Sequence, residues 1–254
     1  MTAAIVAKQR DRIHIATDAA IYRQGEGVVA FGSKVTTVPH WPGCITGAGN
    51  AAAGPLFAPA LGRLFSTWDL MIDGWTNAIQ EIQNLAGAFE LSHATIIMAG
   101  ISEKRGPESF TFQTTLTLPP GTTAEEAEAS PYYQPPFALV KLPDVIMTPV
   151  CPPEMSIAAK YEGIDVEADP DVVAWSMHKV IEMQRHMPLP YGVGGIGGFA
   201  EIATVSERGV TTRVLHRWPE DKIGGPLRPK PTNWSRWHIE NPKPKRGPAL
   251  QVVK

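Results

Sequence analysis

The chain has 254 residues, enough for one large domain that buries a sizeable core, and we expect a single domain. Its 23 Lys and Arg residues stand against 25 Asp and Glu residues, so the overall charge excludes a general preference for nucleic acids, membrane surfaces or acidic substrates. No apolar run approaches the ~18 residues that a membrane-spanning helix needs, and Lys8, Arg10 and Arg12 interrupt the first segment where a secretory signal would be apolar. We therefore expect a cytoplasmic protein that does not contact a membrane.

Proline and cysteine usage add further limits. The 24 prolines run at roughly twice the usual frequency of about 5%, and they cluster in segments that read as loops and a tail. Cys44 and Cys151 form no metal-binding spacing with a histidine, which is typical of reduced thiols in a cytosolic chain. A single disulfide between the two cysteines stays open.

The chain begins with a pattern that predicts a β-hairpin. Residues 3–8 and 12–17 are short β-type runs, the second with isoleucine at alternate positions, and a polar turn joins them. If the turn centres on Arg10, Thr2 stands across from Asp18 with both side chains on one face of the hairpin.

Helices and strands alternate in the next hundred residues. We expect, in order, strands at 33–38 and 43–49, a helix from Pro55 to about Asp73, a helix with Ile79, Ile82, Leu85 and Phe89 on one face, and strands at 93–102 and 109–115.

The second half of the chain opens with a segment, 116–143, whose prolines and small polar residues predict an inserted loop without regular structure. A second pair of helices is expected at 151–163 and 169–187. In the latter, Asp169 is placed to cap the helix and Pro170 to occupy its first turn. An apolar stripe on that helix predicts that one face is buried, and it comprises Val173, Met177, Val180 and Ile181.

Two strands are expected within 198–218, before a proline-rich basic tail. We therefore divide the chain into a domain at 1–224 and a tail at 225–254. The order of strands, two helices, strands, two helices and strands favours the α+β class and a four-layer αββα sandwich, in which two antiparallel sheets lie between helix layers.

Thr2 is the candidate nucleophile. A threonine hydroxyl is ordinarily weak, but loss of Met1 would leave an α-amino group on the same residue, and that amine can accept the hydroxyl proton. We expect Met1 to be removed, autocatalytically or by an aminopeptidase, because aminopeptidases that remove methionine prefer a small residue behind it.

Asp18 and Lys34 complete the candidate catalytic group. Asp18 can hold a nearby cation, and Lys34 is the first lysine after it at a plausible strand position. A lysine ammonium close to Thr2 would lower the pKa of the hydroxyl and of the α-amine, which makes the amine a competent base near neutrality. A small-residue loop around Ala48 and Gly49 would let a backbone N–H approach the oxyanion of a bound carbonyl.

These residues resemble the catalytic β subunits of proteasomes and their bacterial HslV-type relatives, which are N-terminal nucleophile (Ntn) hydrolases. Asp18 and Lys34 follow Thr2 by sixteen and thirty-two residues, and this spacing coincides with the family pattern without a gap. Further segments are similar to family segments, namely Gly32 to Val35, Ala48 to Ala52, the strand at 94–102 and Gly197 to Gly209. The resemblance covers about residues 2–115 and 150–217.

The resemblance implies the αββα fold and hydrolysis of peptide or amide bonds by Thr2, with Asp18 and Lys34 as partners and an oxyanion N–H near Ala48 or Gly49. It implies no metal or organic cofactor. It also implies a homo-oligomeric ring or other multimer, with an unfoldase or assembly partner left open.

The sequence departs from the family pattern in the residues that support the nucleophile. The family aspartate and serine before the last strand pair would fall near Val193 and Ile196, and the arginine two places after the family aspartate is Ala20 here. The family Gly-Ser-Gly-Ser stretch is replaced by residues 148–153, and the insertion and tail have no counterpart. An alternative hypothesis is therefore a non-catalytic protein that uses the Ntn fold as a structural subunit of a larger assembly.

Other motifs point to function less strongly. Gly192, Gly194 and Gly197 spell GxGxxG, but the motif follows a helix and leads into a strand, which favours a turn over a nucleotide site. His178 and His186 lie on one helix without an HExxH arrangement, so no metal site is predicted there.

The tail combines basic residues with Trp234 and Trp237, a combination that can bind nucleic acid. We favour an arm that lies over its own domain or over a neighbouring subunit, and we do not expect nucleic acid to be a partner.

Overall fold

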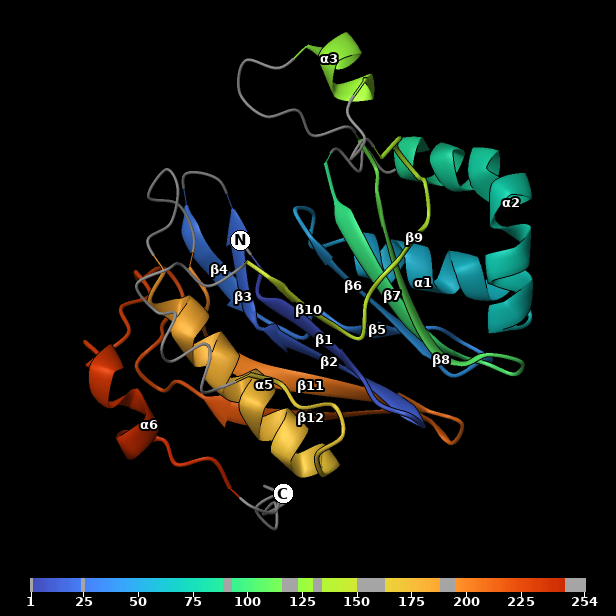
Figure 1. Ribbon diagram of the computed structural model, residues 1–254. Coiled ribbons are helices and arrows are strands. Elements are labelled where there is room, and N and C mark those ends of the chain that lie inside the picture. Colours follow the sequence, from blue (N-terminus) through green and yellow to red (C-terminus); the bar gives the residue numbers. More distant parts are fainter. Residues whose placement is uncertain are drawn as a thin grey trace.

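The computed structural model describes residues 2–23, 26–88, 93–115, 123–129, 134–149, 163–187 and 195–244. Over these residues the chain forms a mixed α+β fold in which every strand pairing is antiparallel (Figure 1). The strands form two five-stranded sheets and one two-stranded sheet.

The first five-stranded sheet has the order β10-β1-β2-β11-β12. Its strands are β1 (Ala4–Lys8), β2 (Arg12–Asp18), β10 (Val145–Thr148), β11 (Phe199–Ser206) and β12 (Gly209–Arg217). The hairpin of β1 and β2 and the strand pair β11 and β12 are confirmed. β10, which adds to the free edge of β1, was not expected.

The register expected for the first hairpin is wrong by one residue. Ala4 pairs with Thr17, so continuing the ladder puts Asp18 opposite Ala3 and not opposite Thr2. The cause is the turn, in which the backbone N–H of Gln9 donates to the carbonyl of Arg12 at 2.9 Å. Such a turn has two central residues where the prediction assumed one.

The second five-stranded sheet has the order β5-β6-β7-β8-β9. Its strands are β5 (Thr36–Thr37), β6 (Gly43–Ala48), β7 (Thr95–Ser102), β8 (Gly106–Gln113) and β9 (Val140–Lys141). The remaining two strands, β3 (Ala20–Arg23) and β4 (Gly27–Phe31), pair with each other and were not expected.

The segment 116–143 contains regular structure in its described part, so that expectation is wrong. It carries the short helix α3 (Ala124–Glu128) and the strand β9, which pairs with the edge of β8. Phe137 anchors the segment, because its ring is 6% exposed in an aromatic core and its carbonyl accepts the indole N–H of Trp75 at 2.9 Å.

The longer helices are α1 (Ala53–Leu64), α2 (Trp68–Ala88) and α5 (Pro170–Arg185). The first helix was expected to run on to about Asp73. It ends earlier because Phe65 is extended and residues 65–67 are not helical. A new helix, α2, then begins, and the hydroxyl of Thr67 caps it by accepting the N–H of Leu70. The start of α5 is confirmed, since Asp169 accepts the N–H of Asp171 at 2.9 Å and Pro170 is its first residue. The helix expected at 151–163 falls almost wholly outside the described residues.

Three apolar clusters hold these elements together. The first joins α1 and α2 to the second sheet through Phe57, Trp68 and Phe112. The second contains side chains from both five-stranded sheets, Ile15 and Ile97 among them. The third packs α5 on the first sheet through the stripe predicted from the sequence, Val173, Met177, Val180 and Ile181. Each fully buried aliphatic or aromatic side chain contributes about 1.5–3 kcal/mol.

The tail lies against its own chain in its described part. Trp234 and Trp237 pack on the α5 cluster at a short 3₁₀ helix (η3, Trp234–Arg236) and at α6 (Trp237–Glu240), and Trp237 is 4% exposed. Over the described ranges, no helix combines the length and the apolar character needed to cross a bilayer.

Candidate active site

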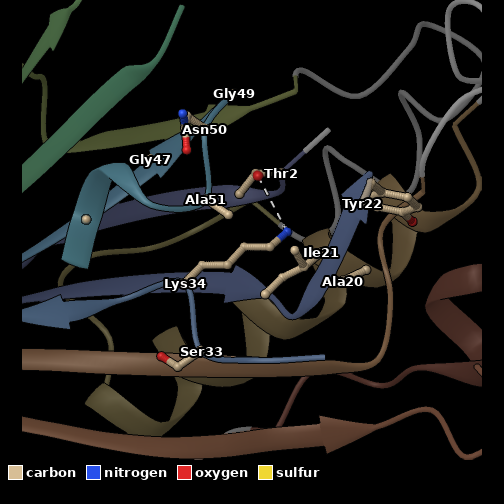
Figure 2. Close-up of a pocket in the computed structure, with 11 residues that line it drawn as sticks. Thr2, Ala20, Ile21, Tyr22, Ser33, Lys34, Gly47, Gly49, Asn50 and Ala51 are labelled. Atoms are coloured by element: carbon tan, nitrogen blue, oxygen red, sulfur yellow. Dashed lines mark hydrogen bonds between the residues drawn. The ribbon is translucent and has the colours of Figure 1, made fainter. Parts of the chain in front are cut away.

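Thr2, Asp18 and Lys34 come together at one end of the first sheet. Thr2 precedes β1, Asp18 is the last residue of β2, and Lys34 lies between β4 and β5. The ammonium of Lys34 donates to Asp18 Oδ1 at 2.7 Å and lies 3.4 Å from Thr2 Oγ1, the contact drawn in Figure 2. Lys34 therefore bridges the carboxylate and the hydroxyl.

Asp18 is held by backbone donors as well as by the lysine. Its Oδ1 accepts the N–H of Ala3 at 3.0 Å, and its Oδ2 accepts the N–H groups of Ala20 at 3.1 Å and Gly197 at 3.2 Å. The side chain of Asp18 is 0% exposed and that of Lys34 is 9% exposed. A buried ion pair is stable when the remaining lone pairs of its carboxylate also accept hydrogen bonds, and these three N–H groups donate them to Asp18.

The backbone at 195–198 connects the site to the rest of the molecule. Gly197 donates to Asp18, and its carbonyl accepts the N–H of Ala19 at 3.0 Å. The phenol of Tyr22 donates to the carbonyl of Gly195 at 2.5 Å and also accepts the N–H of Gly195. Burial raises the pKa of Tyr22, so the phenol keeps the proton that it donates.

A buried ion pair supports the same turn from the other side. Arg185, at the end of α5, contacts Asp221 at 2.6 Å, and both side chains are almost fully buried. The same pair binds the turn, because Arg185 donates to the carbonyl of Ile196 at 3.1 Å and Asp221 accepts the N–H of Gly198 at 2.7 Å. A Cβ on Gly197 would lie 2.5 Å from Asp221 Oδ2, so the turn needs glycine there.

A pocket of about 210 Å³ opens beside Thr2. Figure 2 shows Thr2 and Lys34 pointing toward each other between two walls, one made by Ile21 and Tyr22 and the other by the loop that follows β6. The lining residues are Thr2, Ala20, Ile21, Tyr22, Ser33, Lys34, Gly47, Gly49, Asn50, Ala51 and Gly54. The volume is below the about 300–1,000 Å³ of pockets that hold drug-sized ligands, and it suits one side chain or a small amide.

The two residues predicted to offer a backbone N–H to the oxyanion, Ala48 and Gly49, lie differently with respect to the pocket. Gly49 lines the pocket, whereas Ala48 is not among its lining residues. Gly49 has a φ of +99°, and a Cβ at this position would lie 2.2 Å from the carbonyl oxygen of His93. Only glycine fits this backbone, which brings the main chain directly to the pocket wall.

Sequence reasoning missed Tyr22, Arg185 and Asp221. Arg185 and Asp221 are separated by 36 residues along the chain, and their contact depends on how α5 packs, so no local spacing signals it. The glycines at 195–198 are the one signal that could have pointed to a tightly packed turn.

Two histidines and a glutamate form a second cluster of polar side chains, which the sequence did not predict. Over the described part of the chain, the side chains able to hold a metal ion in a group of three are His178, Glu182 and His216, and they lie outside the pocket. Of the two cysteines, which were expected to be reduced thiols, Cys44 is free and buried, and burial raises its pKa to about 12. Cys151 lies outside the described residues.

Comparison of the sequence with protein-family models gives no match, and a search of curated proteins gives none either. The residues of the site provide a hydroxyl, a buried ammonium held by a carboxylate, and a glycine backbone around one small pocket.

Proposed function

We propose that this chain hydrolyses peptide or other amide bonds with Thr2 as an N-terminal nucleophile, after Met1 is removed. The observation that carries the proposal is the position of the Lys34 ammonium, 2.7 Å from Asp18 Oδ1 and 3.4 Å from Thr2 Oγ1. A buried cation directed at a hydroxyl favours its alkoxide form, which is what a nucleophile requires.

The first half of the proposed reaction forms an ester on Thr2. Once Met1 is gone, the nitrogen of Thr2 is a primary amine that can take the proton from its own hydroxyl while Oγ1 attacks the carbonyl carbon of the substrate. The amine then passes that proton to the departing nitrogen as the C–N bond breaks. Lys34 stabilises the charge on Oγ1, and Asp18 holds Lys34 in place.

The second half releases the acid. The Thr2 amine removes a proton from water, the resulting hydroxide attacks the ester, and Oγ1 regains its proton as the acyl group leaves. The backbone N–H of Gly49, at the pocket wall, is our choice for the oxyanion donor in both steps, with Ala48 as its neighbour. The pocket walls at Ile21 and Tyr22 would contact the substrate side chain.

The stacking of sheets and helices fits this activity. Two five-stranded antiparallel sheets share one apolar cluster, α1 and α2 cover the second sheet, and α5 covers the first. We propose that this arrangement is the four-layer αββα sandwich of Ntn hydrolases. The missing family support residues are then replaced by the N–H of Gly197 and by the pair of Arg185 and Asp221 that holds its turn.

Mass spectrometry of the purified protein tests the first requirement. We expect a mass that lacks Met1 and a free Thr2 amine. A chain that retains Met1 would contradict the hydrolase and favour the non-catalytic structural subunit.

A covalent probe tests the nucleophile whatever the substrate is. A β-lactone is a strained ester that acylates an activated hydroxyl, and we expect it to add to the peptide that begins with Thr2. Thr2→Ala should lose the adduct and at least about a thousandfold of any amidase activity, whereas Thr2→Ser should keep both in part. Thr211→Ala, at an exposed position on β12, is the matched control and should behave like wild type. A Thr2→Ala protein that is labelled and cleaves amides like wild type would refute the mechanism.

Self-assembly is proposed as a separate property. Leu70 on α2 and Ile223 are 55% and 64% exposed, but single exposed apolar side chains are normal on monomers, so this proposal rests on the resemblance to proteasome-type subunits. Light scattering on the purified protein is expected to show a multimer, and a monomer at all concentrations would contradict it.

A further inference from the structure

Two histidines and a glutamate gather between α5 and the edge strand β12, on the opposite face of the first sheet from the second sheet. His178 and Glu182 lie four residues apart on α5, so they share one face of the helix, and His216 comes from β12. One ligand atom from each of the three side chains lies within 4.8 Å of the other two. These residues line no part of the pocket at Thr2.

The Nε2 atom of His178 is buried and has no hydrogen-bond partner. The nearest carboxylate oxygen, Oε1 of Glu182, is 3.9 Å away, too far for a hydrogen bond. Buried polar atoms without a partner are rare in folded proteins because each costs about 1–3 kcal/mol. A third species between Nε2 and Oε1 would satisfy both atoms.

The protonation states of the three side chains suit a cation. Burial lowers the pKa of His178 to about 3, and burial also lowers the pKa of His216. Burial opposes ionisation of Glu182, but the adjacent His178 and the charged, hydrogen-bonded Lys179 favour the carboxylate, so its pKa is lowered. At neutral pH the cluster therefore presents two neutral imidazoles and a carboxylate, the forms that bind metal ions.

We propose that His178, Glu182 and His216 bind a divalent transition-metal ion of the zinc class. Two imidazole nitrogens and one carboxylate oxygen form a ligand set that Zn²⁺ accepts, with bonds of about 2.0–2.2 Å at tetrahedral angles, so that two ligand atoms on one ion lie about 3.3–3.6 Å apart. The distance of 3.9 Å between His178 Nε2 and Glu182 Oε1 is slightly longer than that, and the three ligand atoms lie within 4.8 Å of one another. Side-chain shifts of about 1 Å would bring all three onto one ion.

The neighbours of the cluster leave room for this role. The second oxygen of Glu182 is held by Lys179 at 2.5 Å, which orients Oε1 without occupying it. The rings of His178 and His216 stack with their centroids 5.0 Å apart. The ring of His216 also meets that of Trp218 edge-on, with 5.3 Å between the centroids. Aromatic packing alone accounts for the stacking but leaves the orphan nitrogen unexplained.

The bound ion would tie helix to sheet. α5 supplies two ligands and β12 the third, and α5 also ends in Arg185, which holds the turn beside Asp18. Because the unfolded chain does not hold the three groups together, an ion that binds the native state stabilises it by mass action.

Calorimetric titration of untagged, chelator-treated full-length protein with Zn²⁺ tests the proposal. We expect one equivalent to bind with a dissociation constant below about 10 μM, and a visible absorption band of bound Co²⁺ as independent evidence of nitrogen ligation. His216→Asn should weaken binding at least tenfold, and so should Glu182→Gln. His216 is exposed on the edge strand β12, so we expect its replacement to leave the fold intact. His40→Asn is the matched control, since His40 is exposed and its φ of +77° is one that asparagine tolerates.

Zn²⁺ should also raise the unfolding temperature of wild type and of His40→Asn, but not that of His216→Asn. Three outcomes would overturn the proposal. They are an absence of binding to wild type at millimolar Zn²⁺, an equal affinity of wild type and His216→Asn, and a loss of binding in His40→Asn that matches the loss in His216→Asn. Each would mean that the cluster is aromatic packing only.

Discussion

Gly49 shows how one backbone position shapes the candidate site. Its φ of +99° is a conformation that L side chains rarely adopt, and the space where a Cβ would sit is filled by the carbonyl of His93, 2.2 Å away. β6 ends immediately before it, and the chain turns there into the wall of the pocket beside Thr2. The backbone geometry therefore requires glycine at this position.

Gly49→Ala should destabilise the protein by more than the cost of a positive φ. Gly209 has a similar φ of +108° with no atom near its missing Cβ, so Gly209→Ala measures the backbone cost alone, about 1–2 kcal/mol. Urea unfolding should show a loss in Gly49→Ala that is larger by at least about 1 kcal/mol, because the His93 backbone must move. Equal losses in the two variants would mean that the loop at 93 adapts freely.

At the scale of elements, α5 acts through its last turn. Arg185 is buried there against Asp221, and the two side chains hold the carbonyl of Ile196 and the N–H of Gly198. Between those residues lies Gly197, a donor to Asp18. The helix thus reaches the carboxylate of Asp18 through a single turn of backbone.

Asp221→Asn should be strongly destabilising because it leaves the buried guanidinium of Arg185 with only Glu220 as an anionic partner, and Glu220 is 3.7 Å away and 41% exposed. Removing one partner of a buried pair costs about 3–5 kcal/mol. Glu26→Gln is the matched control, since Glu26 pairs with Arg23 on the surface with both side chains more than half exposed, and it should cost at most about 1 kcal/mol. Thermal and urea unfolding of the two variants make the comparison. Similar stabilities for both would show that the buried pair is not a support of the turn.

The elements that could be predicted from the sequence are those with local signals. The cap at Asp169 and Pro170 and the apolar stripe of α5 each lie within one element, and both are confirmed. The alternation in β2 is also local, and Ile13 and Ile15 pack in the cluster shared by the two sheets, whereas Ala16 packs in the cluster with α5. β10 was missed because it is four residues long, and its pairing with β1 joins segments about 140 residues apart. The hairpin register was missed by one residue because it depends on the turn type.

The candidate site divides in the same way. The spacing of Thr2, Asp18 and Lys34 could be read from the chain, and the structure brings their side chains together. Tyr22, Arg185 and Asp221 could not be found, because each acts through packing on backbone groups far away in sequence. The group of His178, Glu182 and His216 was missed because only two of its members share a helix.

At the scale of the whole molecule, burial of histidine couples stability to pH. His14 is 2% exposed in β2, and burial, with smaller contributions from Arg12 and Arg213, lowers its pKa to about 4. Its ring nitrogens lie 2.9 Å from Thr204 Oγ1 and from Gln9 Oε1, contacts that the neutral imidazole makes as one donor and one acceptor. His14 therefore stays neutral in the native state at pH values at which the unfolded chain, with a histidine pKa near 6.5, binds a proton.

His14 should contribute about 3 kcal/mol of stability at pH 7 that is lost at pH 4. Its pKa is lower in the folded state than in the unfolded state, so the unfolded state binds more protons between these values and the free energy of unfolding falls as pH falls from about 6.5 through about 4. His14→Gln keeps an amide that can bond to Gln9 and Thr204 but cannot titrate, so its free energy of unfolding should fall less steeply over this range. Urea unfolding at several pH values between 7 and 4 measures the difference, with His40→Asn as an exposed control expected to follow wild type. A His14→Gln protein with the same dependence on pH as wild type would show that protonation of His14 is not what couples folding to acid.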